Sequence, residues 1–236
     1  MNSKKLTAEK AVQYIKSGMI VGLGSGSTAT WAIRKIGELV KEGLNIQAVA
    51  SSVKTESLAT EVGIPITDFK NIDRVDIYID GADEVDDEGN LTKGGGGALL
   101  REKILAYNSK RFIVIIDETK RVKTLGKFDL PVEIIPFAAE ITLKRLKETG
   151  TNPLIRNAGN EKFITDNGNF IADCNFYPIL EPQALSKQLH LIPGVVETGF
   201  FGYNMVHTII VGYSNGKVRE FDTTLDGWNK APGWIE

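Results

Sequence analysis

Acidic residues and lysines in glycine-containing segments are the groups of this sequence best suited to chemistry. The segment Asp80-Gly-Ala-Asp83 places two acids three residues apart, and Lys93-Gly-Gly-Gly-Gly97 precedes Glu102. A third segment, Gly22-Leu-Gly-Ser-Gly-Ser-Thr28, combines glycines with hydroxyl side chains. Such a set suits proton abstraction next to a carbonyl, because a carboxylate takes up the proton while lysine and hydrogen-bond donors stabilise the enediolate charge.

The segment 22–28 follows a short apolar stretch and precedes a helical pattern. Backbone N–H groups at the start of a helix bind phosphate, and Ser25, Ser27 and Thr28 would add hydroxyl donors. The dinucleotide-binding fingerprint does not match, since its third glycine is missing and the next strand ends in Ser51-Ser52 where a ribose-binding acid belongs. A tight strand-to-helix turn with capping hydroxyls is the alternative.

The pair Asp80 and Asp83 lies at the end of an apolar strand pattern, which is unusual for a plain surface turn. A calcium-binding EF-hand loop is excluded, because the alternating acids before its glycine are absent. A solvated acidic loop is the alternative, and we expect it to contain four further acids, namely Glu84, Asp86, Asp87 and Glu88.

Four consecutive glycines in 94–97 are costly, at roughly 1 kcal/mol each relative to alanine, so we expect close backbone approach to a ligand there. The segment is not a P-loop, because Lys93 precedes the glycines. Glu102 lies about one turn into the next helix, where a solvent-facing glutamate is the alternative. Lys120 follows the strand predicted at 111–117, and a surface lysine is its alternative.

Strand and helix patterns alternate through the first half of the chain. Apolar strands are predicted at 19–23, 45–50, 75–79 and 111–117, and helices at about 28–41, 55–62 and 98–107, after a first helix capped by Thr7. This alternation predicts βαβ units and a parallel sheet that helices cover on both faces. Ligands bind beyond the carboxyl ends of such strands, and the chemically interesting segments all follow strands there.

The second half is close to a βαββαβ unit, with one predicted strand more than its four. Strands are predicted at 132–135, 153–157, 162–165, 169–174 and 194–198, with a hairpin turn at Asp166-Asn-Gly168 and helices at 137–147 and 182–190. The strand 206–212 could rejoin the first sheet. We therefore predict an α/β fold with a Rossmann-like, mostly parallel sheet domain (1–130 plus about 206–236, catalytic) and a smaller ferredoxin-like α+β domain (about 131–205).

The composition excludes several functional classes of protein. The 236 residues include 28 Lys and Arg against 30 Asp and Glu, a net charge of -2 that gives no field for nucleic acid or an anionic membrane. Cys174 is the single cysteine, and the two histidines are far apart, so a metal cluster is not expected. No apolar run approaches the ~20 residues that span a bilayer, and no signal peptide is apparent. We expect a cytoplasmic protein.

The motifs and their order resemble those of the A-type ribose-5-phosphate isomerases over nearly the whole chain. The matching segments are GLGSGSTA (22–29), DGADE (80–84), KGGGGA (93–98), REK (101–103), KFDLPVEIIP (127–136), DNGNF (166–170) and IPGVVET (192–198). The resemblance implies interconversion of ribose 5-phosphate and ribulose 5-phosphate in the pentose phosphate pathway, without a metal or organic cofactor. It also implies a homodimer or homotetramer.

The resemblance also implies roles for individual residues. Glu102 would be the base that moves a proton between C1 and C2. Asp80, Asp83 and Lys93 would bind sugar hydroxyls, assist ring opening and stabilise the enediolate. The implied substrate-binding residues are Ser25, Gly26, Ser27, Thr28, Asp80, Gly81, Ala82, Asp83, Lys93, Gly94, Gly95, Gly96 and Lys120. The tail from Thr223, with Trp228 and Trp234, runs past the matched part.

Three other classes of protein are alternatives to the isomerase. A sugar-phosphate-sensing domain of a transcription regulator would carry a helix-turn-helix before residue 20, where only one helix is predicted. A CoA transferase would need a glutamate nucleophile and a larger acyl-carrier site. A nicotinamide dehydrogenase would need the missing ribose-binding acid.

Overall fold

A computed structural model describes residues 2–223 of the chain, which forms two compact units. Within the described residues, the first unit comprises 2–82, 101–121 and 203–223, and the second comprises 83–100 and 122–202. The second unit thus includes residues 83–100 and 122–130, which the predicted boundaries assign to the catalytic domain. That division into a catalytic and a small domain stays a prediction, and the tail with Trp228 and Trp234 lies outside the described residues.

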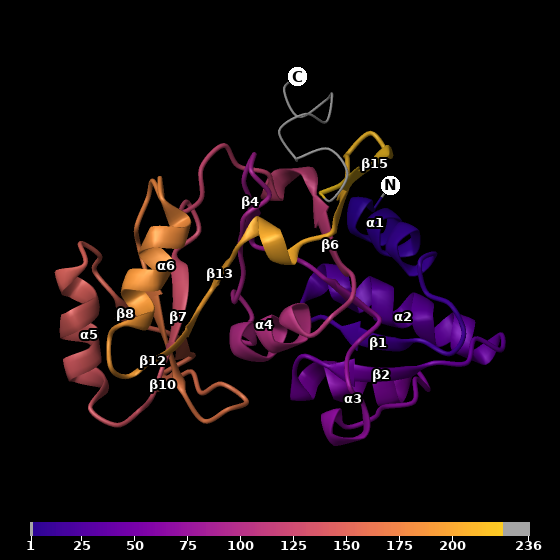
Figure 1. Ribbon diagram of the computed structural model, residues 1–236, viewed down its shortest axis with the longest axis horizontal. Helices are drawn as coiled ribbons and strands as arrows, with labels where there is room; N and C mark the ends of the chain where they lie inside the picture. The colour runs from indigo at the N-terminus through magenta and orange to yellow at the C-terminus, as the bar shows by residue number, and fades with distance from the viewer. Residues whose placement is uncertain (1, 224–236) are drawn as a thin grey trace. The chain divides into compact units, whose positions relative to one another are not determined.

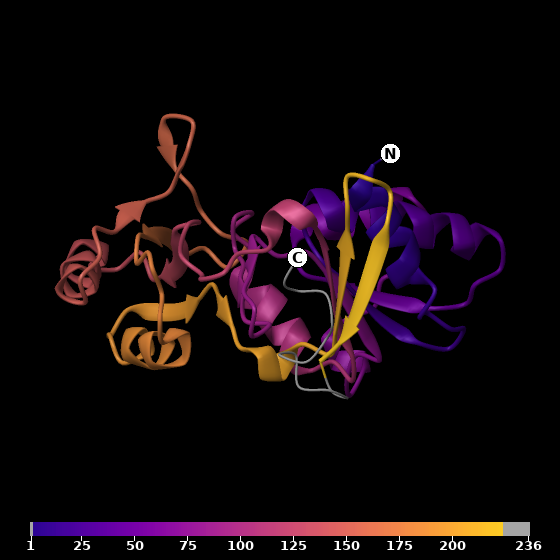
Figure 2. The same ribbon diagram turned by 90° about the horizontal axis from the view of Figure 1, so that it is seen from above.

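The first unit is built on a six-stranded sheet with the order β15-β14-β6-β3-β1-β2 (Figure 1). The strands are β1 (Ile20–Leu23), β2 (Gln47–Ala50), β3 (Ile77–Asp80), β6 (Phe112–Asp117), β14 (Thr208–Gly212) and β15 (Val218–Asp222). All neighbours are parallel except the hairpin β14–β15, which Figure 2 shows in yellow. The predicted parallel sheet is confirmed, including the return of the chain at β14.

Helices of the first unit accompany this sheet. They are α1 (Ser3–Val12), α2 (Ser27–Lys41), α3 (Val53–Glu61) and α4 (Leu99–Tyr107), whose first two residues belong to the second unit, with the 3-10 turns η1 (Phe69–Asn71), η2 (Glu118–Lys120) and η3 (Tyr203–Met205). The predicted cap of the first helix is wrong. Asn2 caps α1 by accepting the N–H of Lys5, whereas Thr7 is buried inside the helix and donates to the carbonyl of Lys4.

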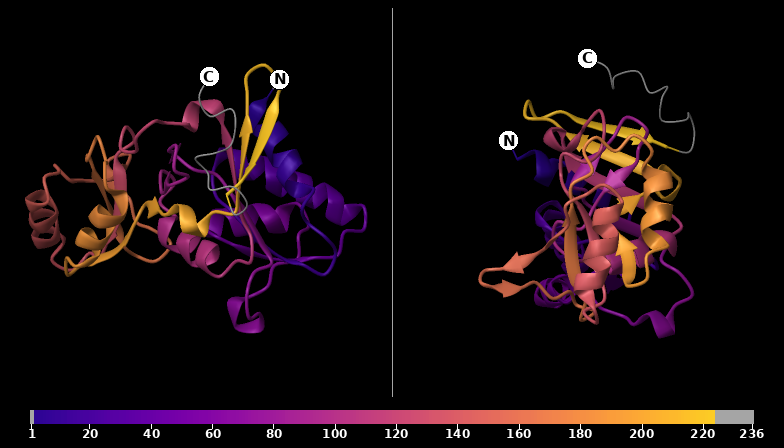
Figure 3. Two further views of the ribbon diagram at one scale, coloured as in Figure 1. Left: turned by 45° about the horizontal axis from the view of Figure 1, so that its top comes forward. Right: turned by 90° about the vertical axis from the view of Figure 1, so that its left-hand side faces the viewer.

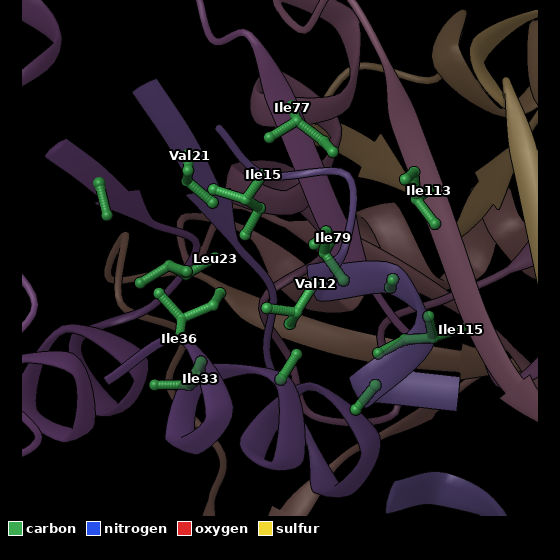
Figure 4. Close-up of a cluster of buried hydrophobic side chains, with 14 of the residues drawn as sticks. Val12, Ile15, Val21, Leu23, Ile33, Ile36, Ile77, Ile79, Ile113 and Ile115 are labelled. Carbon is green, nitrogen blue, oxygen red and sulfur yellow. The ribbon is translucent and has the colours of Figure 1, made fainter. Parts of the chain in front are cut away.

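A core of aliphatic side chains joins one face of this sheet to its helices. Alternate residues of β1, β3 and β6 point to this face, as the two-residue period of a strand requires. Figure 4 shows them meeting residues of α1 and α2; labelled are Val12, Ile15, Val21, Leu23, Ile33, Ile36, Ile77, Ile79, Ile113 and Ile115. The intervening residues therefore face the other side of the sheet, where Tyr78 stacks on Phe112 with ring centroids 4.8 Å apart.

The second unit contains a four-stranded antiparallel sheet with the order β12-β7-β11-β8. Its elements follow the chain as β7 (Leu130–Ile134), α5 (Ala139–Glu148), β8 (Leu154–Ile155), β11 (Phe170–Cys174), α6 (Pro182–His190) and β12 (Val195–Thr198). The fourth strand lies beside the first, and the third lies between the first and the second. This is the ferredoxin-like βαββαβ arrangement that the sequence predicts.

Short strands that the sequence pattern does not reveal complete the second unit. They are the three-stranded sheet β13-β5-β4 (Phe200–Phe201, Leu91–Thr92, Glu84–Val85) and the hairpin of β9 (Asn157–Ala158) and β10 (Glu161–Lys162), which Figure 3 shows extending from the four-stranded sheet. The pairing predicted for the strand 162–165 is confirmed at Ile164, which forms an antiparallel bridge with Phe170, and is wrong at Lys162, which pairs with Asn157. The predicted turn at 166–168 is present, with Thr165 N donating to Asn169 O over 2.9 Å.

The expectation of a solvated acidic loop is wrong for Glu84 and Asp86. Glu84 is 3% exposed and accepts the N–H groups of Gly126 and Phe128 at 2.8 and 2.9 Å. Asp86 is also buried and accepts from the backbone and side chain of Asn90. These hydrogen bonds replace those that water would make, which is why both carboxylates can be buried.

No helix within residues 2–223 has the length and apolar character that a membrane crossing would require.

Gly22 of β1 and Gly24 directly after it make room for side chains of the adjacent strand β3. A Cβ added at Gly22 would lie 2.8 Å from Cδ2 of Tyr78, and one at Gly24 would overlap the carboxylate of Asp80. We therefore expect Gly24→Ala to lower the free energy of unfolding by about 1–3 kcal/mol, because the carboxylate must leave its position.

The control for this substitution is Gly81→Ala, since a Cβ at Gly81 would meet its nearest atom at an ordinary 3.7 Å. Urea unfolding followed by circular dichroism gives both values. Equal stabilities of the two variants would contradict the close packing of β1 on β3.

Candidate active site

Three predicted site segments leave the first sheet at one edge. Strands β1, β3 and β6 are parallel neighbours, so the loop after Leu23, the segment after Ile79 and the turn containing Lys120 all begin at carboxyl ends. In open parallel sheets this edge binds ligands. The structure therefore brings together the predicted site residues of the first unit that follow these strands.

Asp80 is fully buried at the end of β3. Its Oδ1 accepts the backbone N–H groups of Ser25 at 3.0 Å and Gly81 at 2.7 Å, and its Oδ2 accepts the hydroxyl of Tyr78. A buried carboxylate is tolerated when donors surround it in this way. These three bonds fix the direction of the carboxylate and tie the loop after β1 to the end of β3.

Tyr78 is buried and shares its surroundings with two carboxylates. Burial raises the pKa of its phenol well above the ordinary value, and the negative charges of Asp80 and Glu102 raise it further. The phenol therefore stays protonated at physiological pH and can donate to Asp80.

Glu102 lies in the first turn of α4 and is 4% exposed. The alternative of a solvent-facing helical glutamate is thereby excluded. A shielded carboxylate is the kind of group that removes a proton from carbon, because water does not compete for it.

The start of α2 offers backbone donors. Gly26 precedes the helix with φ +104° and makes no side-chain capping hydrogen bond, and Gly26 and Ser27 are exposed. Such an uncapped helix start favours an anion. Lys4 of α1 adds a positive charge, since its Nζ donates to Ser27 Oγ over 2.9 Å. Sequence reasoning missed Lys4, and only the packing of α1 beside α2 reveals it.

Ser25 has a different function from its neighbours in this loop. Its hydroxyl lies within hydrogen-bond distance of three others, on Ser51, Ser52 and Thr55, at 2.8, 2.8 and 2.9 Å. Thr55 also donates to the carbonyl of Gly24. The hydroxyl of Ser25 thus holds the turn together, which agrees with the alternative of a capped strand-to-helix turn at this position.

Lys120 ends η2, directly beyond β6. The side chain of Asp117 accepts the N–H of Thr119 at 3.0 Å and so caps this turn. Lys120 is partly exposed at the ligand edge of the sheet.

In the second unit, the glycine segment is held against Asp83. Gly95 N donates to Asp83 Oδ2 over 2.7 Å, and Asp83 N donates to Thr92 O over 2.8 Å. A Cβ at Gly95 would lie 2.7 Å from the same carboxylate, whereas one at Gly96 would meet nothing within 4 Å. Gly95 therefore serves the loop itself, and Gly96 faces open space where a ligand atom can approach.

The first and last glycines of this segment shape its turn. Gly94 and Gly97 have φ values of +101° and +79°, and Gly97 N donates to Gly94 O over 2.9 Å. Gly97 also leaves space for the ring of Phe163, which a Cβ would overlap. Internal packing thus explains why Gly94 and Gly97 are glycines, whereas the sequence suggests that the whole segment approaches a ligand.

Lys93 is 3% exposed, so it is not an ordinary surface lysine. Its Nζ lies 5.6 Å from the ring centroid of Phe201, and its backbone N donates to Gly199 O over 2.8 Å. The aromatic face stabilises the ammonium after its removal from water.

The predicted site residues fall into both units. Those of the first unit are Ser25, Gly26, Ser27, Thr28, Asp80, Gly81, Ala82, Glu102 and Lys120; those of the second are Asp83, Lys93, Gly94, Gly95 and Gly96. Because the chain runs directly from Asp80 to Asp83, their Cα atoms are at most roughly 11 Å apart. Residues 2–223 contain no group of three or more His, Cys, Asp and Glu side chains placed to hold a metal ion.

Comparisons with known proteins agree with this geometry. The family model described as ribose 5-phosphate isomerase A (phosphoriboisomerase A) matches residues 47–216. The ribose-5-phosphate isomerase A 1 of Oceanobacillus iheyensis is 50% identical over 89% of this chain and 93% of its own length. The ribose-5-phosphate isomerase A of Bacillus mycoides is 49% identical over 94% of this chain and 100% of its own.

Solved structures show the same fold. The ribose 5-phosphate isomerase A of Methanocaldococcus jannaschii superposes with a TM-score of 0.88 at 40% identity, covering 93% of this chain and 98% of that one. A D-ribose-5-phosphate isomerase in complex with phospho-erythronic acid gives 0.89 at 39% identity, covering 94% and 100%. This chain belongs to the ribose 5-phosphate isomerase A family.

Proposed function

We propose that this protein interconverts D-ribose 5-phosphate and D-ribulose 5-phosphate through an enediolate. The observation that carries the proposal is the burial of Glu102 in the first turn of α4, in a chain of this family. A shielded carboxylate next to a sugar phosphate is suited to moving a proton between neighbouring carbons.

Glu102 performs the proton transfer. Its carboxylate removes the proton from C2 of the open-chain aldose, and the electron pair of the C–H bond moves into the enediolate. The carboxyl group returns the proton to C1, while O2 loses its proton and O1 gains one. The reaction is redox-neutral overall, because the aldehyde is reduced as the alcohol carbon is oxidised.

Buried Asp80 and Lys93, together with half-buried Asp83, bind the reacting end of the sugar. Asp80 and Asp83 accept protons of sugar hydroxyls and assist ring opening, and the ammonium of Lys93 stabilises the negative enediolate oxygen. The fixed direction of Asp80 and the hydrogen bond from Gly95 to Asp83 support these roles, since preorganised groups need not rearrange during the reaction.

The phosphate binds at the start of α2 and near Lys120. Backbone N–H groups of residues 26–28, the hydroxyls of Ser27 and Thr28, and the ammonium of Lys4 suit an anion there. The bound ligand of a relative, phospho-erythronic acid, combines a phosphate with a carboxylate, which are the two kinds of anion that this arrangement would recognise.

A non-catalytic sugar-phosphate sensor is the other function considered, and it is not favoured. Relatives that are 44–50% identical are named isomerases, and a sensor has no need of a buried base. We further propose that the enzyme acts in the pentose phosphate pathway of the cytoplasm, as a homodimer or homotetramer, and that residues 1–130 with about 206–236 form its catalytic domain.

Removal of the base tests the mechanism. We expect Glu102→Gln to lower kcat for ribose 5-phosphate by about 10²-fold or more, because an amide cannot accept the proton. KM should change little, since the variant keeps the phosphate and hydroxyl contacts. Ketose formation in a coupled or direct absorbance assay measures both constants.

The matched control is Glu148→Gln on α5, whose carboxylate is exposed and pairs with Arg145. It should retain the wild-type rate. If Glu102→Gln turned over at a near-normal rate, Glu102 would have no place in the mechanism.

Loss of hydroxyls at the start of α2 tests the phosphate site. Ser27→Ala and Thr28→Val should each raise KM by about 10-fold with little effect on kcat, because a hydrogen bond to a charged group contributes about 1.5–3 kcal/mol in substrate and transition state alike. Ser57→Ala on α3, whose hydroxyl bonds only locally to Val53 O, is the control. An unchanged KM would show that the phosphate binds elsewhere, for example at the Lys93 loop.

A further inference from the structure

Arg156 contacts the glycine segment from a part of the sequence that no motif singles out. Its Nη1 donates to the carbonyl oxygens of Gly94 at 2.7 Å and Gly95 at 3.1 Å. The side chain is only 15% exposed. A single guanidinium nitrogen therefore binds two successive carbonyls of the loop that carries Lys93.

The rest of the guanidinium is fixed by Asp173 on β11. Nε donates to Oδ2 over 2.9 Å, and Nη2 donates to Oδ1. This two-pronged pairing holds the plane of the guanidinium in one orientation.

The backbone of Arg156 is equally constrained. Its N–H donates to Ile171 O over 2.8 Å, and its carbonyl accepts the N–H of Phe163 at 2.9 Å. The ring of Phe163 in turn lies against Gly97. Arg156 is thus anchored to the four-stranded sheet before it reaches the loop.

We propose that Arg156 is a positioning residue that sets the direction of the Gly95 and Gly96 N–H groups; this rests on the proposed isomerase function. A trans peptide is planar, so its C=O and N–H point in opposite directions. Binding of Gly94 O by Arg156 directs Gly95 N–H to the opposite side, where it meets Asp83 Oδ2.

The same reasoning applies to the next peptide. Binding of Gly95 O by Arg156 directs the Gly96 N–H away from the guanidinium. Gly96 is exposed, and a Cβ there would meet nothing within 4 Å, so its surroundings can hold a substrate oxygen. Arg156 therefore orients both Asp83 and a backbone donor for the reacting end of the sugar without touching it.

A glycine segment needs such an external restraint, because glycine has the largest choice of backbone conformations. Lysine is a poor substitute for Arg156. Its single ammonium cannot contact two loop carbonyls and both oxygens of Asp173 with the same geometry.

The test combines kinetics with amide exchange in the full-length protein. Arg156→Met keeps the apolar stem and removes the guanidinium, and it should lower kcat for ribose 5-phosphate by about 10- to 100-fold with a smaller change in KM. Hydrogen exchange of the Gly95 amide, followed by NMR, should accelerate by about 10-fold. Arg156→Lys should lie between this variant and wild type in both readouts.

Arg145→Met is the matched control, since Arg145 is an exposed arginine that pairs with Glu148 in the same unit. It should match wild type in both measurements. If Arg156→Met fails to fold, Arg156→Lys and Asp173→Asn supply the same readouts. Wild-type kcat and Gly95 exchange in these variants would overturn the proposal. An inactive wild-type enzyme would instead overturn the proposed function, and the exchange data alone would then decide the role of Arg156.

Discussion

The burial of Asp80 at the end of β3, beside the loop after β1, is the constraint on which the candidate active-site edge of the first sheet depends. The carboxylate can lie there only because Gly24 has no side chain and because Ser25, Gly81 and Tyr78 donate hydrogen bonds to it. These bonds in turn place the loop that leads into α2. The core on the opposite face of the sheet holds β1, β3 and β6 in register, so packing on one face secures the polar groups on the other.

In the second unit, hydrogen bonds hold the carboxylate of Asp83 in a similar way. Its carboxylate accepts the N–H of Gly95, whose own carbonyl and that of Gly94 are held by Arg156. Both units therefore fix an acid by backbone N–H groups of a glycine-containing loop. Burial of Asp80, Lys93 and Glu102 has a considerable desolvation cost, and proteins keep such groups mainly where chemistry requires them.

Much of this organisation can be predicted from the sequence. The central strand β6 is apolar from Phe112 to Ile116, and the glycine-rich turns after β1 and before α4 mark their helix starts, so the two fold types and the loops of the candidate site are accessible to pattern reasoning. Contacts between distant segments cannot be predicted from such patterns. The two-residue strands β4 and β5 are too short to show a period, and Glu84 looks like part of an acidic loop until its amide donors at Gly126 and Phe128 are known. Lys4 and Arg156 are missed for the same reason, since each acts on a loop far away in the chain.

The central claim is that a shielded carboxylate carries a proton between C2 and C1 of the sugar. Proton NMR of ribose 5-phosphate incubated with the enzyme in D₂O tests it most directly, because a base that exchanges its proton with solvent introduces deuterium into the product. The account predicts ribulose 5-phosphate labelled at C1 with the wild-type enzyme, and ketose formation slowed by about 10²-fold or more with Glu102→Gln. Ketose formed by the variant at the wild-type rate, with or without label, would contradict it.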